Sequence, residues 1–173
     1  KVLLENYPPL VDICAKYGFD NDEIVFLLNN FKLEPFRLNE VKINNNLFVN
    51  DSKSTNIVTT IFAVKNYPYA IVILGGDDKH LNYEEFIDGF NKYGIKEVIC
   101  FGGLKEKLFS ILNPHFKCLK FNILDDVFTY LKANITESDV ILFSPGSSSF
   151  DLYKDYKARG YHFDKLLEQF FGK

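Results

Sequence analysis

The sequence predicts an α/β protein: a Rossmann-like, open and mostly parallel sheet with helices on both faces, preceded by a short helical segment. Two observations favour this fold class. Short apolar runs such as Ala70–Leu74 alternate with stretches whose apolar residues recur at helical spacing, a pattern typical of a parallel sheet covered on both sides. The 173 residues, 47% of them hydrophobic and 25% charged, are also enough to bury a core.

The first part of the chain is expected to be helical. Pro8 and Pro9 open an apolar-periodic stretch that Gly18 closes, and Asp20 is a good N-cap for a helix over 23–31. Because two helices cannot enclose a core alone, we expect them to belong to a preceding domain or to pack against the next one. We therefore divide the chain into the helical end of a preceding domain plus a hinge, residues 1–36, and an α/β domain, residues 37–173.

From Leu38 onward the pattern changes to alternating strands and helices. Residues 38–43 and 47–50 read as strands of a hairpin around Asn44–Asn46. The later strands are expected at 70–74, 97–101, 118–121 and 140–143, and the helices at about 54–65, 83–93, 104–112, 123–133 and 149–171. Ligands of such sheets bind beyond the carboxyl ends of the strands. Three polar loops fall there, and they are the candidate site: Asn50–Asn56, Gly75–Lys79 and Ser144–Phe150.

The loop Asn50–Asn56 leads from a strand into a helix. A helix start has unpaired N–H groups and partial positive charge, so it attracts anions. This loop adds a lysine, hydroxyl groups and an aspartate. An ordinary capped helix start is the alternative interpretation.

The loop Gly75–Lys79 follows the most apolar strand. Its glycines let the backbone approach a ligand, and Lys79 would be a point cation for a carboxylate or phosphate. The alternative is a tight turn with a solvated lysine. The G-x-G-x-x-G spacing of dinucleotide sites is absent from this loop. Asp77 and Asp78 lack a third ligand, so we predict no metal site.

The loop Ser144–Phe150 offers hydroxyl and N–H groups that could hold a carboxylate. Alternatively, Ser148 or Ser149 is simply the N-cap of the last helix. We do not expect a nucleophilic serine, because G-x-S-x-G is absent. Beyond this loop, the aromatic residues read as core packing, and Lys154, Lys157 and Arg159 read as a solvated face.

Charge and composition narrow the possible partners. The net charge is −3 and the lysines are spread along the chain, which argues against a nucleic-acid surface. No apolar run reaches the roughly 18 residues needed to cross a bilayer, so we expect no membrane partner. Three cysteines without metal-like spacing indicate a reducing compartment.

Together the three loops resemble motifs in the C-terminal domain of the Mur ligases, the ATP-dependent amide-bond-forming enzymes of peptidoglycan synthesis. Asn50–Asn56 matches the family's Asn-Asp-Ser-Lys-x-Thr-Asn, and Leu74–Lys79 matches Leu-Gly-Gly-x-x-Lys. Ser144–Asp151 matches Ser-Pro-(small)₃-Ser-(apolar)-Asp, which in the family precedes a lysine, an aromatic residue and Arg-Gly, here Lys154, Tyr156 and Arg159-Gly160. The resemblance covers roughly residues 20–173. Phe36 stands where the family's hinge has a histidine.

The resemblance implies the amino-acid-binding part of a member that adds D-glutamate to UDP-N-acetylmuramoyl-L-alanine through an acyl phosphate. It assigns D-glutamate binding to Thr55, Lys79, Ser149, the Phe150 backbone and Tyr156. It places Arg37, Asp51 and Lys53 near the ribose and phosphates of ATP. The alternatives are another amino-acid-adding ligase of the Mur and folylpolyglutamate synthase superfamily, or a freestanding α/β module that binds a small acidic ligand.

The resemblance also sets expectations for what lies outside this sequence. Residues 1–36 would be the end of the central ATPase domain with the hinge, and ATP and Mg would be held mostly by missing N-terminal and central domains. The phosphate-cradling G-x-x-x-x-G-K-[ST] does not occur here, so we expect no catalytic residue in this fragment and no activity from it alone. The implied location is the bacterial cytoplasm.

Overall fold

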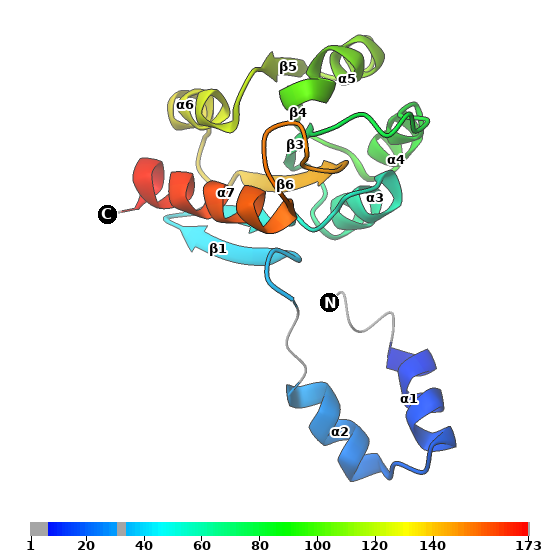
Figure 1. Ribbon diagram of the computed structural model, residues 1–173. Coiled ribbons are helices and arrows are strands. Elements are labelled where there is room, and N and C mark those ends of the chain that lie inside the picture. The colour runs from blue at the N-terminus through cyan, green and yellow to red at the C-terminus, as the bar shows by residue number, and fades with distance from the viewer. Residues whose placement is uncertain (1–6, 31–33, 173) are drawn as a thin grey trace. The chain divides into compact units, whose positions relative to one another are not determined.

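A computed structural model describes residues 7–30 and 34–172, and its contacts divide the chain into two compact units, residues 1–34 and 35–173 (Figure 1). The first unit contains α1 (Tyr7–Lys16) and α2 (Asn21–Asn30). The backbone N–H of Glu23 donates to Asp20 Oδ1 over 2.8 Å, and the N–H of Asp20 donates to Glu23 Oε2 over 2.9 Å. This reciprocal pair is a capping box, so the N-cap expected at Asp20 is confirmed.

The second unit begins at Pro35 and holds the whole sheet. Its strands are β1 (Asn39–Ile43), β2 (Asn46–Asn50), β3 (Ile71–Gly75), β4 (Glu97–Phe101), β5 (Cys118–Phe121) and β6 (Val140–Gly146). Its helices are α3 (Ile57–Asn66), α4 (Glu85–Tyr93), α5 (Lys105–Leu112), α6 (Leu124–Asn134) and α7 (Tyr156–Phe171), with a 3₁₀ turn η2 at Gly102–Leu104.

The six strands form one sheet in the order β1-β2-β6-β3-β4-β5. The β1–β2 hairpin is antiparallel, and every other neighbouring pair is parallel. β3 and β4 are buried along their whole length, which explains why β3, and β4 after its first residue Glu97, are apolar. The open, mostly parallel sheet expected from the sequence is therefore confirmed, with β1 and β5 as its edge strands.

Helices cover both faces of this sheet (Figure 1). Alternate strand residues such as Ile73, Ile99 and Phe143 form a core with α6 and α7, to which Phe128 and Phe163 belong. The residues between them point to the opposite face, where α3, α4 and α5 pack. Because α7 takes part in the core, its first turn is held firmly at the carboxyl end of the strands.

The last helix starts later than the sequence analysis expects. α7 begins at Tyr156, and Asp155 caps it by accepting a hydrogen bond from the N–H of Ala158 over 2.7 Å. Residues 149–155 form turns instead, so neither Ser148 nor Ser149 is the N-cap of this helix. Asp151 ties this segment to the 3₁₀ turn η2, because its Oδ2 accepts the N–H of Gly103 over 2.7 Å.

Candidate functional site

The three polar loops meet at one edge of the sheet. β2, β6 and β3 are neighbouring parallel strands, so their carboxyl ends lie together. Asn50–Asn56 leads from β2 to α3, Gly75–Lys79 leads from β3 toward α4, and Ser144–Phe150 ends β6 and leads toward α7. We call them the first, second and third loop.

Hydrogen bonds join each loop to the others. The N–H of Gly146 donates to the carbonyl of Ser54 over 3.0 Å, which ties the third loop to the first. The N–H of Asp77 donates to the carbonyl of Ser148 over 2.8 Å, and the hydroxyl of Ser147 donates to the carbonyl of Asp77, which ties the third loop to the second. Gly76 is required at this junction, because a Cβ there would lie 2.0 Å from the Ser148 carbonyl oxygen.

Lys79 and Thr55 lie beside each other, as the sequence predicts. The Lys79 ammonium donates to the backbone carbonyl of Thr55 over 3.2 Å and is exposed to solvent. Ser149 follows Ser148, whose carbonyl accepts the N–H of Asp77 in the second loop. Ser149 is 2% exposed, whereas Phe150 is 70% exposed. An exposed ammonium at the edge of these loops is chemically suited to a carboxylate ligand.

Tyr156, the first residue of α7, contacts Lys53 of the first loop. The Lys53 ammonium lies 5.5 Å from the centre of the Tyr156 ring, and the Ser52 hydroxyl donates to the Tyr156 carbonyl over 2.8 Å. The half-buried Arg37 is anchored by its N–H, which donates to Asn39 Oδ1 over 3.0 Å. Arg37 and Lys53 give this side of the site two cations.

Phe36, which replaces a histidine of the family pattern, is a packing residue. Its carbonyl accepts the N–H of Lys53 over 2.9 Å, and its ring meets Tyr161 edge-on with the ring centres 4.8 Å apart. A Cβ on Gly160 would lie 2.4 Å from the Phe36 ring, so the ring fills the space that this glycine leaves. The segment before β1 is thereby fixed to the first loop and to α7.

Asp51 lies inside the protein, with only 3% of its surface exposed. Its carboxylate accepts hydrogen bonds from the Ser54 hydroxyl, from the Ser144 hydroxyl at 2.8 Å and from the N–H of Leu38 at 3.2 Å. Burial raises the pKa of this carboxyl group to about 6, although the two hydroxyl hydrogen bonds act in the opposite direction. Asp51 therefore joins the first loop, β6 and the segment before β1.

Arg159 corrects one expectation: it is fully buried rather than part of a solvated face. Its guanidinium donates to the Ser52 carbonyl over 2.9 Å, to the Ser147 carbonyl over 3.1 Å and to the Ser52 hydroxyl over 3.1 Å. A longer contact of 3.5 Å reaches the carbonyl of Gly75. Burial lowers the pKa of Arg159 to about 10. One side chain on α7 thus holds all three loops.

Tyr83 is also absent from the residues predicted for the site, although it is 1% exposed and contacts the second loop. Its hydroxyl accepts the N–H of Lys79 over 3.2 Å and donates to Asp78 Oδ1 over 3.0 Å. The helical spacing of Arg159 with Phe163 and Leu166 could have identified the arginine as buried. No comparable pattern distinguishes Tyr83 from the other aromatic residues.

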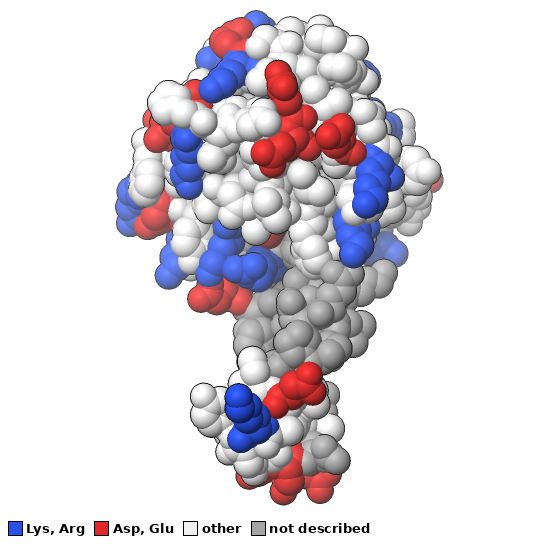
Figure 2. Space-filling view, turned by 90° about the vertical axis from the view of Figure 1, so that its right-hand side faces the viewer, with Lys and Arg blue, Asp and Glu red and all other residues white. Residues whose placement is uncertain are grey.

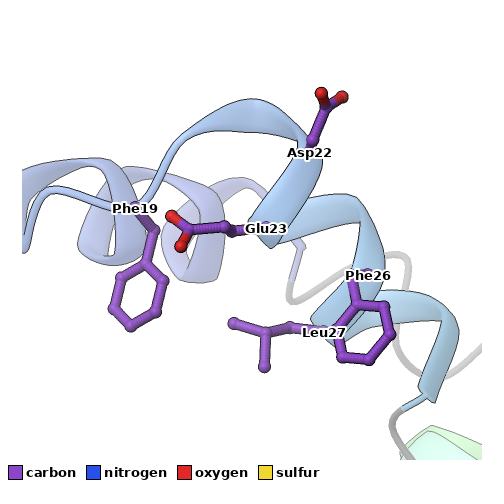
Figure 3. Close-up of a pocket in the computed structure, with 5 residues that line it drawn as sticks. All are labelled: Phe19, Asp22, Glu23, Phe26 and Leu27. Atoms are coloured by element: carbon purple, nitrogen blue, oxygen red, sulfur yellow. The ribbon is translucent and has the colours of Figure 1, made fainter.

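Other features of the described residues lie away from the loops. Within residues 7–30 and 34–172, no cluster of three His, Cys, Asp or Glu side chains could hold a metal ion, and no helix is long and apolar enough to cross a membrane. Figure 2 shows basic and acidic side chains interspersed on the face drawn. A hollow on the first unit is lined by Phe19, Asp22, Glu23, Phe26 and Leu27; in Figure 3 the Asp22 side chain points away from the others.

Curated relatives match nearly the whole chain. UDP-N-acetylmuramoylalanine–D-glutamate ligases of Natranaerobius thermophilus and Prochlorococcus marinus are 30% and 33% identical over 95% and 96% of the chain. That of Petrotoga mobilis is 36% identical over 88%. The chain spans only 36–37% of the length of these three relatives and corresponds to their C-terminal part. No family profile matches the chain.

Solved structures share the fold. MurF of Acinetobacter baumannii superposes with a TM-score of 0.66 at 18% identity, covering 97% of this chain and 37% of its own. UDP-N-acetylmuramate-alanine ligase MurC of Thermotoga maritima gives 0.66 at 14% identity, covering 95% and 37%. A bifunctional folylpolyglutamate synthase/dihydrofolate synthase of Yersinia pestis gives 0.62 at 13%, covering 86% and 35%. At these identities the likeness concerns the fold alone.

Proposed function

We propose that this chain, a member of the Mur ligase family that corresponds to the family's C-terminal domain, is the amino-acid-binding part of a ligase that adds D-glutamate to UDP-N-acetylmuramoyl-L-alanine. The observation that carries this proposal is the meeting of the three motif loops at one sheet edge, with the Lys79 ammonium beside Thr55. The names of the relatives, which cover about 95% of the chain, support it independently.

The loops would bind the amino acid through complementary charge. D-glutamate has two carboxylates, and such a ligand needs a cation together with hydroxyl and N–H donors. Lys79 would be the cation, Thr55 and Ser149 the hydroxyl donors, and the Phe150 backbone a further N–H donor, with Tyr156 at the border of the pocket. Tyr156 is half-buried and Lys79 exposed, so both can meet a ligand from solvent.

Arg37 and Lys53 would face the nucleotide. Both carry positive charge. They lie on adjoining segments, because the N–H of Lys53 donates a hydrogen bond to the carbonyl of Phe36, the residue before Arg37. Asp51 we assign to the same nucleotide side, but as a buried anchor of these segments, since its carboxylate is already occupied by three protein donors.

ATP and Mg, held mostly by domains outside this chain, would supply the activation of the muramoyl-alanine carboxylate as an acyl phosphate. Of that nucleotide site, the residues present could provide two cations, Arg37 and Lys53. Among the described residues, no cluster of side chains could hold a metal ion. This chain's own contribution would be to hold the D-glutamate amine in line with the activated carbonyl and to exclude competing water. We place the reaction in the bacterial cytoplasm, where the nucleotide is available.

The first unit would be the end of the central ATPase domain. Phe26 and Leu27 of α2 are 66% and 45% exposed, and the hollow of Figure 3 lies on the same helix. Apolar side chains exposed together are expected to be covered by more protein. The missing N-terminal and central domains are therefore proposed partners of this unit.

The kinetic test uses the whole ligase that contains this chain. We expect Lys79→Ala to raise the D-glutamate KM by roughly 10- to 150-fold, the effect of one lost charge-assisted hydrogen bond, with little change in the ATP KM. Lys92→Ala, an exposed lysine in the last turn of α4, is the matched control. An unchanged D-glutamate KM in Lys79→Ala would refute the assignment of Lys79.

A panel of amino acids separates the second candidate function, a ligase of the same superfamily that adds another amino acid. The shared fold does not separate the two, because MurF and the folylpolyglutamate synthase have it as well. Equal use of L-glutamate or diaminopimelate in place of D-glutamate would favour it. The third candidate, a freestanding module that binds a small acidic ligand, requires that no upstream phosphate-binding loop is encoded in the same reading frame.

A further inference from the structure

The second loop is supported by three side chains that stand outside the fixed positions of the site's motifs. Tyr83 precedes α4, Asp78 lies in the second loop beside Lys79, and Lys107 projects from α5. Tyr83 accepts the Lys79 N–H at 3.2 Å and donates to Asp78 Oδ1 at 3.0 Å, and Lys107 Nζ lies 2.9 Å from Asp78 Oδ2. We call Asp78, Tyr83 and Lys107 the brace.

Further contacts link the members of the brace to one another and to their neighbours. Asp78 Oδ1 also accepts the N–H of His80 over 2.7 Å, so one carboxylate oxygen closes a turn around Lys79. The Lys107 ammonium lies 5.0 Å from the centre of the Tyr83 ring, which places a cation on the ring face as well as on the carboxylate. The Tyr83 ring itself packs against Phe86 at a centre distance of 6.5 Å.

This arrangement fixes both ends of Lys79. Its backbone N–H is held by Tyr83, and its ammonium is held by the Thr55 carbonyl. The hydroxyl of the buried Tyr83 is already engaged, because it accepts the Lys79 N–H and donates to Asp78 Oδ1. Its influence on the site must pass through the position of Lys79. The neighbouring Lys107 lowers the pKa of Asp78, which keeps that carboxylate ionised and able to accept these hydrogen bonds.

We propose that Tyr83, supported by Asp78 and Lys107, is a positioning residue that sets where the Lys79 ammonium meets the amino-acid carboxylate. The inference rests on the proposed function for its substrate and on the described contacts for the brace itself. It predicts that removing one buried hydroxyl group weakens recognition of the amino acid without touching the nucleotide side.

The first arm of the test concerns the brace alone and uses this chain. Tyr83→Phe removes the hydroxyl and keeps the packed ring, so we expect faster hydrogen exchange of the Lys79 amide and unchanged exchange in β3. Tyr130→Phe is the matched control, because Tyr130 interacts with Glu97 at the amino end of β4. An unchanged Lys79 amide would overturn the proposal.

The second arm concerns the site and uses the whole ligase. Tyr83→Phe should raise the D-glutamate KM roughly 2- to 12-fold, the range for one neutral hydrogen bond, with kcat and the ATP KM within twofold of wild type. Lys107→Met should raise it about 1.4- to 5-fold, and this increment should shrink at high salt, because the Lys107 and Asp78 side chains are 43% and 32% exposed.

The outcomes separate the two ideas. Faster exchange at Lys79 with an unchanged D-glutamate KM would mean that the brace is structural only, and equal losses in kcat and both KM values would mean general misfolding; either result overturns the positioning role. A wild-type ligase that does not use D-glutamate would overturn the proposed function and the substrate claimed here, while the exchange experiment would still decide whether the brace exists.

Discussion

Replacing Arg159 tests whether one buried cation holds the three loops together. Arg159→Met keeps most of the side chain's length and removes the guanidinium. The Ser52 and Ser147 carbonyls then lose the donors now at 2.9 and 3.1 Å. A buried carbonyl left without a partner costs about 1–3 kcal/mol, so the two together cost about 2–6 kcal/mol.

An opposing effect reduces this cost. The pKa of Arg159 is lowered to about 10 from 12.5 because burial disfavours its charge, and at 1.36 kcal/mol per pKa unit this corresponds to about 3 kcal/mol that the methionine avoids. We therefore expect a net loss of at most about 3 kcal/mol in the free energy of unfolding. Arg159→Lys should recover only part of it, because an ammonium cannot span both carbonyls.

Urea unfolding followed by far-UV circular dichroism measures the loss, and hydrogen exchange in β3 and β6 confirms that it concerns the sheet. Lys157→Met is the matched control, since Lys157 is an exposed cation two residues away on the same helix. The reasoning is refuted if exchange at Ser52 and Ser147 is no faster in Arg159→Met than in Lys157→Met, or if Arg159→Met is less stable than Lys157→Met by clearly more than about 3 kcal/mol.

Three further outcomes are expected. The folded Asp51 carboxyl has a pKa raised to about 6 from 3.8, so the free energy of unfolding should fall as pH rises from about 4 to 6. In Asp51→Asn this fall should be smaller by about 3 kcal/mol. Urea unfolding at pH 4 and pH 7 measures it, and an equal change in both proteins would contradict the prediction. Gly76→Ala should destabilise by at least 1–3 kcal/mol in urea, because φ is +134° and the Cβ would meet the Ser148 carbonyl, whereas Gly18→Ala, with nothing within 4 Å, bears only its φ strain of +86°. The purified 173-residue chain should release no ADP from ATP, muramoyl-alanine substrate and D-glutamate; measurable ligation would place the phosphate chemistry in this chain.

The sheet could be predicted from the sequence because its central strands are buried on both faces. Continuous apolar runs such as Ile71–Gly75 leave few alternatives, and the loops that follow such strands must gather at one edge. The start of the last helix was harder to place. Ser147–Ser149 looks like a cap, but Asp155 competes with it and Asp151 is tied to Gly103, a contact that spans 48 residues of sequence.

The burial of polar groups was the part that local patterns could not give. Asp51 and Lys53 look equivalent in a loop, yet Asp51 is enclosed by donors from Leu38 and Ser144, which come from distant parts of the chain. Arg159 likewise reads as one more basic residue until the loops around it are in place. The three loops that meet at the sheet edge could therefore be predicted from the sequence, but the buried side chains that support them could not.

The two edge strands bear on how the chain behaves at high concentration. A border strand exposes a row of backbone groups on which another copy can add its own strand and begin a fibril. Here the borders are only five and four residues long, and Lys42 on β1 and Lys120 on β5 are exposed there. The positive charge of a lysine on each of these strands opposes self-association, so replacing both lysines with neutral residues is the change expected to promote fibril formation.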